Sequence, residues 1–119
     1  MSCAIAGTYN MTCQQGATLD KSITWSDSAR NPYNLTGYTA RMQVRSSVSS
    51  PTVLLELTTT NGRIILGSSE YNIRLLVDAI TTSALTPGLY VYDLEVVSGS
   101  GVVDRIIEGN FKVNAEVTR

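Results

Sequence analysis

Histidine is absent from this sequence of 119 residues, and its absence excludes several kinds of active site. Serine–histidine and cysteine–histidine pairs cannot form, and a metal site built on imidazole cannot form either. Neither Lys21 nor Lys112 completes a Ser-x-x-Lys pattern, and the 10 acidic residues are scattered singly. No glycine-rich phosphate loop joins a strand to a helix. We therefore expect a protein that is not an enzyme and that holds no metal or cofactor.

Charge and long apolar runs are also scarce. Charged residues make up 16% of the chain and the net charge is -1, so no strong field would attract nucleic acid or an anionic membrane. No apolar run approaches the length of a membrane span, and the first residues lack the basic and apolar parts of a secretory signal. We expect no nucleic-acid partner, no membrane partner and synthesis in a cytoplasm.

Cysteine occurs only at Cys3 and Cys13. Free thiols are the usual state in a reducing compartment. A straight strand rises about 3.3 Å per residue and would hold the two sulfurs about 33 Å apart, so a bridge within the chain requires a reversal near Gly7. Free thiols are the main expectation, while a bridge within the chain and a bridge between subunits both stay open.

The dominant pattern is an alternation of apolar and polar residues with a period of two. It predicts strands at residues 5–13, 17–25, 38–44, 53–57, 64–66, 71–77, 90–97 and 102–113. Polar turns separate them, and Leu35 is expected to point inward from one of these loops. Many short antiparallel strands and almost no helix predict an all-β sandwich of two sheets. The boundaries are an N-terminal arm or first strand at 1–13 and one domain at 14–119.

Three local signals refine this prediction. Asn61 and Gly62 predict a tight turn and a hairpin between the strands on either side. Asp78 can cap one or two helical turns up to residue 85, with Ile80 and Leu85 turned inward. Val102 and Ile106 fall outside the register of the last strand, which predicts a β-bulge near Arg105.

The stretch "LTPGLY" at residues 85–90 has the Leu-x-Pro-Gly-x-Tyr arrangement of a tyrosine corner. In immunoglobulin-like sandwiches the hydroxyl of such a tyrosine bonds to backbone a few residues upstream. Pro87, Gly88 and Tyr90 are therefore predicted structural residues of an immunoglobulin-like antiparallel sandwich. Trp25 is predicted to fill the core from an early strand.

Interface candidates come mainly from arginine, which accounts for seven of the 9 basic residues and is favoured at protein interfaces. Arg41 and Arg45 are expected not to share a strand face, and solvated strand positions are the simpler interpretation for both. Asp93 and Glu95 are expected on a solvated face. The full set of candidate interface residues is Cys3, Cys13, Tyr33, Arg41, Arg45 and Arg105.

Three stretches together resemble small proteins of tailed bacteriophages: "QQGATLDKSITWSDSARNPYNLTGYTARMQVRSS", "LLELTTTNGRI" and "LTPGLYVYDLEVVSGSGVVDRIIEGNFKV". The resemblance runs over residues 14–113 and leaves the first 13 residues outside it. Within it, "NLTGYTARMQVR" is loosely similar to the immunoglobulin-like N-terminal domain of siphophage baseplate upper proteins, which anchors receptor-binding proteins to a tail.

This resemblance implies a non-enzymatic structural protein of the virion, made in the bacterial host cytoplasm and repeated by the symmetry of the particle. Its expected partners are other phage structural proteins and further copies of itself. The favoured role is a tail, baseplate or tail-fibre-attachment component. A neck, collar or capsid-decoration protein is the alternative, and a receptor-binding module for host glycans is a third.

Overall fold

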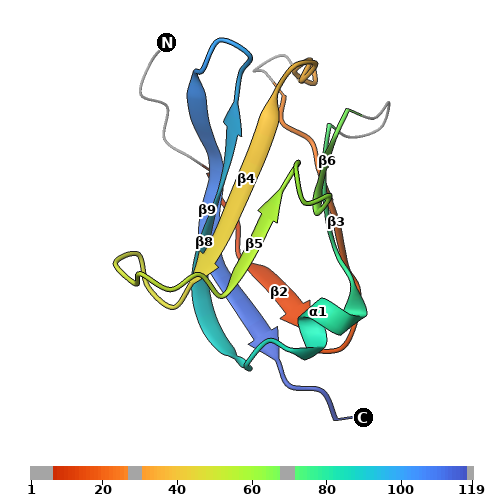
Figure 1. Cartoon of the computed structure of the whole chain (residues 1–119), viewed down its shortest axis with the longest axis vertical. Helices are drawn as coiled ribbons and strands as arrows, with labels where there is room; N and C mark the ends of the chain where they lie inside the picture. Colours follow the sequence, from red (N-terminus) through yellow and green to blue (C-terminus); the bar gives the residue numbers. More distant parts are fainter. Residues whose placement is uncertain (1–6, 27–30, 68–71, 118–119) are drawn as a thin grey trace.

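Two β-sheets and one short helix make up the part of the chain that the computed structural model describes, which is residues 7–26, 31–67 and 72–117. Figure 1 shows the elements. In chain order they are β1 (Gly7–Thr8), β2 (Met11–Gln14), β3 (Leu19–Ile23), β4 (Thr39–Arg45), β5 (Leu55–Thr58), β6 (Ile64–Leu66), β7 (Ile73–Val77), α1 (Ala79–Ser83), β8 (Gly88–Val97) and β9 (Val103–Asn114).

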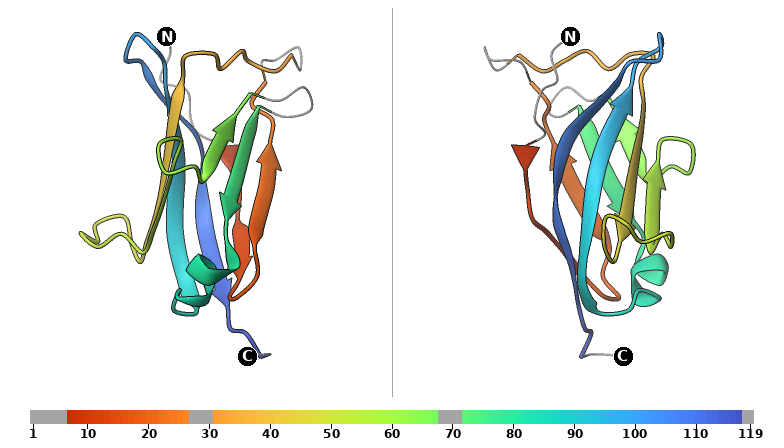
Figure 2. Two further views of the ribbon diagram at one scale, coloured as in Figure 1. Left: turned by 45° about the vertical axis from the view of Figure 1, so that its right-hand side comes forward. Right: turned by 90° about the vertical axis from the view of Figure 1, so that its left-hand side faces the viewer.

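The larger sheet has the strand order β1-β9-β8-β4-β5, and β2 also pairs with β9. The smaller sheet has the order β3-β7-β6. Figure 2 shows the two sheets as separate layers, with α1 at one end of the sandwich. Alternate apolar side chains of both sheets face inward and exclude water, which is the main stabilising term. The largest fully buried ones include Phe111, Met42, Leu57, Ile64, Ile73, Leu75 and Leu94.

The N-terminal strands depart from the predicted antiparallel arrangement, because β1 and β2 both run parallel to β9. Met11 lies opposite Phe111, and Gln14 lies opposite Asn114. A turn after Gln14 then carries the chain into the smaller sheet, so β2 and β3 belong to different layers. The described part of the first 13 residues therefore contains β1 and most of β2, both paired with β9. Residues 1–6, including Cys3, lie outside the described residues.

A short interruption at Tyr9 and Asn10 separates β1 from β2, although both strands keep the same parallel register alongside β9. The Tyr9 amide donates to the Glu108 carbonyl at 2.9 Å, and the Asn110 amide donates to the Asn10 side chain at 3.1 Å. The Tyr92 hydroxyl donates to the Tyr9 carbonyl at 2.5 Å. A side chain at Gly109 would overlap that carbonyl group. Glycine at this position therefore lets the N-terminal backbone approach β9 closely at Tyr9.

The predicted turn at Asn61 and Gly62 exists, but the predicted hairpin is wrong. Gly62 has a φ of 79°, as such a turn requires. However, β5 pairs only with β4 and β6 pairs only with β7 among the described strands. The turn therefore carries the chain from the larger sheet to the smaller one. A tight turn can connect two paired strands of one sheet or two strands of different sheets. The local sequence predicts the turn in either case but does not specify which strands pair.

The helix prediction is confirmed at its start and partly wrong in its orientation. The Asp78 carboxylate accepts from the Thr81 amide at 2.9 Å and caps α1. Leu85 is buried as expected, but Ile80 is 81% exposed. Thr82 is buried instead, because its hydroxyl donates to the Ala17 carbonyl and accepts from the Gly16 amide. These two bonds tie α1 to the turn after β2 and fix which face of the helix points inward.

Two further predictions are confirmed in β8 and β9. The register shifts between Leu94, opposite Ile107, and Glu95, opposite Arg105, so Ile106 is the extra residue of a bulge. The Tyr90 hydroxyl donates to the Thr86 carbonyl at 2.7 Å, which closes the tyrosine corner. Leu35 is buried as expected. The fold is an all-β, immunoglobulin-like sandwich with one short helix, and no helix among the described residues is long and apolar enough to cross a membrane.

Candidate functional site

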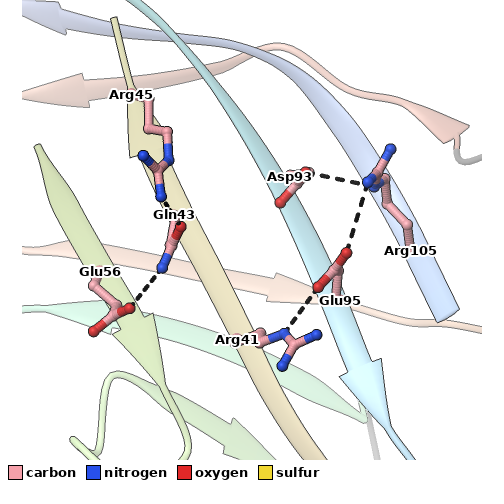
Figure 3. A network of polar contacts seen from close by, with 7 residues as sticks. All are labelled: Arg41, Gln43, Arg45, Glu56, Asp93, Glu95 and Arg105. Atoms are coloured by element: carbon pink, nitrogen blue, oxygen red, sulfur yellow. Dashed lines mark hydrogen bonds and ion pairs between the residues drawn. The ribbon is translucent and has the colours of Figure 1, made fainter. Parts of the chain in front are cut away.

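The outer face of the larger sheet carries most of the candidate interface residues. Along β4, Ala40, Met42 and Val44 are buried, while the alternate residues point away from the core. Arg41 and Arg45 both belong to this outward set, so the expectation that they do not share a face is wrong. They are four positions apart, and a period of two returns the side chain to the same face at every even spacing. Figure 3 shows them flanking Gln43 on β4.

Strand pairing aligns these outward residues in two rows across the sheet. The anionic row contains Glu56 of β5, Gln43 of β4, Asp93 of β8 and Glu108 of β9. The arginine row contains Arg41 of β4, Glu95 of β8 and Arg105 of β9. Asp93 and Glu95 therefore lie on an outward face, as the sequence predicted. Because sequence alone does not give the register between strands, the rows themselves were not predicted.

Arg105 links the two rows. Its guanidinium lies 3.4 Å from the Asp93 carboxylate, 3.7 Å from Glu95 and 3.7 Å from Glu108. Glu95 also accepts from Arg41 Nε at 2.8 Å (Figure 3). One guanidinium thus serves three carboxylates, and the Arg105 side chain is 51% exposed. Ion pairs at such exposure contribute at most about 1 kcal/mol each, so they organise this surface more than they stabilise the fold.

Gln43 and Arg45 form a second chain of contacts beside the first. Gln43 Nε2 donates to Glu56 at 2.8 Å, and Arg45 donates to Gln43 Oε1 at 2.7 Å. Arg45 also donates to the Ser50 carbonyl at 2.6 Å. The Gln43 amide is therefore held on both sides, and Arg45 anchors the loop that projects between β4 and β5.

Asp93 has the most perturbed environment of the outward carboxylates. Burial raises the pKa of Asp93 above its usual value, and the neighbouring Glu95 and Glu108 carboxylates raise it further, while Arg105 and Arg41 act in the opposite direction. Perturbed acids occur both in active sites and in structural ion-pair networks. Here the neighbours are carboxylates and guanidiniums that contact one another, which is the arrangement of a structural ion-pair network.

A shallow groove of about 350 Å³ runs beside Asp93 on this face. Gln43, Arg45 and the projecting loop form one side, and Arg105, Glu108 and Asn110 form the other. Tyr92, the aromatic residue that borders it, has its side chain buried and its hydroxyl bonded to Tyr9. The groove thus combines polar and charged side chains with the apolar side chains of Val48 and Val91, and none of the described residues that line it offers an exposed aromatic ring on which a sugar would stack.

Tyr33 and Trp25 form a separate cluster. Their ring centroids are 4.4 Å apart, and Tyr33 is 42% exposed. Trp25 is half-buried against the core and lies two residues beyond the end of β3, so it fills the core only in part and not from within a strand. Asn72, which the sequence did not predict, is buried, and its side-chain amide bonds the backbone amide and carbonyl of Trp25 at 2.8 and 2.7 Å. An isolated asparagine before a strand gives no sequence signal for this role.

Cys13 is not a surface residue of the described fold, so its prediction as an interface residue is wrong. It lies on the inner side of β2 opposite Val113, is fully buried and is not bridged. Burial raises the pKa of the Cys13 thiol, which keeps it protonated and unreactive. The apolar stripe that places Met11 inward also places Cys13 inward, because both share one face of the strand.

The free edge of β5 is partly closed by the side chains of Asn61 and Arg63. Asn61 Oδ1 accepts from the Thr58 amide at 3.0 Å, and Asn61 Nδ2 donates to the Glu56 carbonyl at 3.1 Å. Arg63 donates to the same carbonyl at 3.0 Å. These are groups that a neighbouring strand would otherwise bind. Asn61 therefore acts against pairing of β5 with another chain.

The sequence matches no protein-family model and no curated protein. Among solved structures, the chain is similar to CopC from Methylosinus trichosporium OB3b, with 14% identity over 98% of this chain and 90% of that chain and a TM-score of 0.42. It is also similar to murine CRIg, with 11% identity over 90% of this chain and 92% of that chain and a TM-score of 0.42. These low values give no information about function, and the phage resemblance remains a prediction from the sequence.

Proposed function

We propose that this chain is a non-enzymatic structural protein of a bacteriophage virion, in the tail, the baseplate or a tail-fibre attachment. The sequence resemblance over residues 14–113 is the basis of the phage assignment. The immunoglobulin-like sandwich that this resemblance implied is the fold of the chain. The protein would be made in the host cytoplasm, reside in the virion and bind other structural proteins of the particle.

The outer face of the larger sheet is the single observation that best supports a binding role. Its two rows place guanidiniums and carboxylates from four strands on a rigid surface. Arginine and carboxylate pairs that are half-exposed give specificity and steer association more than they stabilise one chain. Among the described residues, no group of three or more metal-binding side chains gathers there. The face is suited to recognition of a protein surface.

Mass spectrometry of purified virions tests this proposal. We expect the protein in intact particles, and in the tail fraction after heads and tails have been separated. Recovery with the heads or necks instead would favour the collar or capsid-decoration alternative. If the protein is missing from particles and occurs as a soluble pool in infected cells, the virion proposal is wrong, and a host-directed binding role becomes the better one.

A further inference from the structure

We propose that Asn61 is a site of spontaneous deamidation in the folded protein, and that the reaction opens the partly closed edge of β5. Asn61 lies in the turn between β5 and β6. It is followed by Gly62, the only glycine of the sequence that comes directly after an asparagine. The reaction needs no enzyme and no reactant except water. The inference concerns the chain by itself and does not depend on the virion assignment.

The reaction starts from the backbone nitrogen of Gly62. When this nitrogen loses its proton to hydroxide or water, it attacks Cγ of Asn61 and forms a new C–N bond. The bond between Cγ and Nδ2 then breaks, and Nδ2 takes up a proton and leaves as ammonia, so that a five-membered succinimide ring remains. Water adds to either carbonyl carbon of the ring and opens it. The product is an aspartate or an isoaspartate, in which the backbone runs through the former side chain.

The structure leaves the attacking nitrogen accessible. Asn61 and Gly62 are both exposed, so water reaches the turn. The Gly62 amide donates no hydrogen bond to the described residues and is therefore available for deprotonation. Gly62 also carries no Cβ, which on another residue would crowd the approach to Cγ. Its φ of 79° is a backbone conformation that residues with a side chain rarely adopt, so the turn itself requires glycine there.

Asn61 Oδ1 is placed to carry the negative charge that develops during the attack. It accepts from the Thr58 amide at 3.0 Å and from the Arg63 amide at 3.0 Å. These two donors polarise the side-chain carbonyl and stabilise its oxygen in the tetrahedral state, as backbone amides do in an oxyanion hole. The departing Nδ2 donates to the Glu56 carbonyl, but Arg63 donates to that carbonyl as well, so the loss of Nδ2 leaves no unpaired acceptor.

Deamidation weakens the contacts that close the edge of β5. In the aspartate product an oxygen takes the place of Nδ2, so the Glu56 carbonyl faces an acceptor where it had a donor. This product still accepts from the Thr58 amide. In the isoaspartate product Cγ becomes part of the backbone, so the bonds to both Glu56 and Thr58 are lost. The Thr58 amide is then free to pair with a strand of another molecule.

Asn34 is a matched comparison within the same chain. Like Asn61 it is exposed, and its Oδ1 accepts from the Thr36 amide at 3.0 Å and from the Thr36 hydroxyl at 2.7 Å. It is followed by Leu35, whose side chain is buried. The two asparagines thus differ chiefly in the residue that supplies the attacking nitrogen. Because Leu35 carries a bulky side chain, Asn34 should react more than about 10-fold more slowly than Asn61.

Incubation of the purified full chain at neutral pH, followed by peptide mass spectrometry, tests the first half of the inference. Deamidation raises the mass by the difference between a hydroxyl and an amino group, and isoaspartyl methyltransferase labels the isoaspartate. We expect Asn61 to react first, Asn34 to lag behind it, and the rate at Asn61 to rise with pH. A synthetic peptide of residues 57–64 gives the rate without the fold. An Asn61 that stays intact in the chain while the peptide reacts, or an Asn34 that reacts equally fast, would overturn the inference.

Hydrogen exchange tests the second half. Deamidated chains, separated by ion exchange through their added negative charge, are compared with wild type and with Asn61→Asp, which reproduces the aspartate product alone. We expect the Thr58 amide to exchange at least about 10-fold faster in isoaspartate chains, because its acceptor is lost, and to stay protected in Asn61→Asp. Asn34→Asp adds the same charge away from β5 and should leave Thr58 unchanged. Equal exchange at Thr58 in isoaspartate chains and wild type would refute the opening of the edge.

Discussion

Tyr90 is the residue whose role follows most directly from its contacts. Its hydroxyl donates to the Thr86 carbonyl at 2.7 Å across the turn that leads into β8. We expect Tyr90→Phe to lower the free energy of unfolding by about 1 kcal/mol, the net contribution of one hydrogen bond. Urea unfolding of both proteins measures this difference. Tyr38→Phe is the matched control, since Tyr38 is also half-buried and its hydroxyl bonds to none of the described residues; equal losses in the two variants would contradict the corner.

Gly109 has a steric role that its neighbours define. A methyl group there would overlap the Tyr9 carbonyl, which also accepts the Tyr92 hydroxyl. We expect Gly109→Ala to displace the N-terminal strand from β9 and to lower the free energy of unfolding by about 2 kcal/mol or more, as overpacking does. Denaturant unfolding, with amide exchange of Met11 to Gln14, measures both effects.

Gly99→Ala provides the comparison for that substitution. A methyl group at Gly99 would lie 3.5 Å from the Gly37 carbonyl oxygen, an ordinary contact distance. The variant should therefore change stability little. If both alanine variants behaved alike, the effect at Gly109 would reflect only the lost freedom of glycine and not the close approach of the Tyr9 carbonyl.

Asp93 should affect how stability depends on pH. Its pKa in the folded state is raised above the unfolded value, chiefly by burial, so folding disfavours its ionised form. The penalty is therefore fully present above the folded pKa and disappears as the pH falls below the unfolded value. We expect Asp93→Asn to be neutral or stabilising at pH 7, with the advantage over wild type shrinking as the medium is acidified.

Thermal unfolding of wild type and Asp93→Asn across this pH range gives the comparison, and NMR titration of the Asp93 carboxyl gives its pKa directly. Glu56→Gln serves as the control, because it neutralises another carboxylate of the anionic row that is more exposed. A titration of Asp93 below the usual aspartate range would show that Arg105 and Arg41 outweigh burial.

At the scale of elements, the edge of β5 depends on Asn61. Its side chain substitutes for a neighbouring strand by bonding the Thr58 amide and the Glu56 carbonyl. We expect Asn61→Ala to speed hydrogen exchange at Thr58 and to lower stability by about 1 kcal/mol. Asn61→Asp should retain protection at Thr58, because a carboxylate still accepts from that amide, although it loses the bond to Glu56. Equal exchange rates in wild type and Asn61→Ala would refute the cap.

Alternation along each strand made most elements and most of the core predictable. β4, β7 and β8 follow the period-two pattern closely, since each buries one face and exposes the other. The same pattern also predicts that Arg41 and Arg45 lie on one face of β4, because they are an even number of residues apart. The alternation does not specify which strands pair. For this reason the parallel pairing of β2 with β9, and the passage of the chain from one sheet to the other after Asn61, were not predicted.

The site was less predictable than the fold for the same reason. Arg105, Glu95 and Arg41 form one row only because three strands align in a particular register, with a bulge at Ile106. Ile80 points outward, against the prediction, because α1 turns Thr82 inward, where its hydroxyl bonds to a turn 65 positions away in the sequence. Asn72 likewise acts on Trp25 across a long sequence separation. Such contacts join residues that are far apart in the sequence, so the local sequence pattern does not predict them.

At the scale of the whole molecule, the parallel pairing of the first and last strands has a mechanical consequence. β2 begins at Met11 opposite Phe111, and both strands run the same way, so the start of β1 and the end of β9 lie at opposite ends of the pair. A force pulling Gly7 and Asn114 apart would slide the strands along each other and load all their hydrogen bonds together. Antiparallel strands pulled from adjacent ends would instead open one bond at a time.

A chain built in this way should resist tension better than its thermodynamic stability suggests, because forced unfolding depends on the rate of crossing this barrier. In single-molecule pulling through residues 7 and 114, we expect a high unfolding force that falls sharply in Gly109→Ala, whose N-terminal strand is displaced. Pulling between Thr39 and Val97, which lie opposite each other at one end of the antiparallel pair β4 and β8, should give a lower force. Linked end to end, such domains would transmit load along a row of copies.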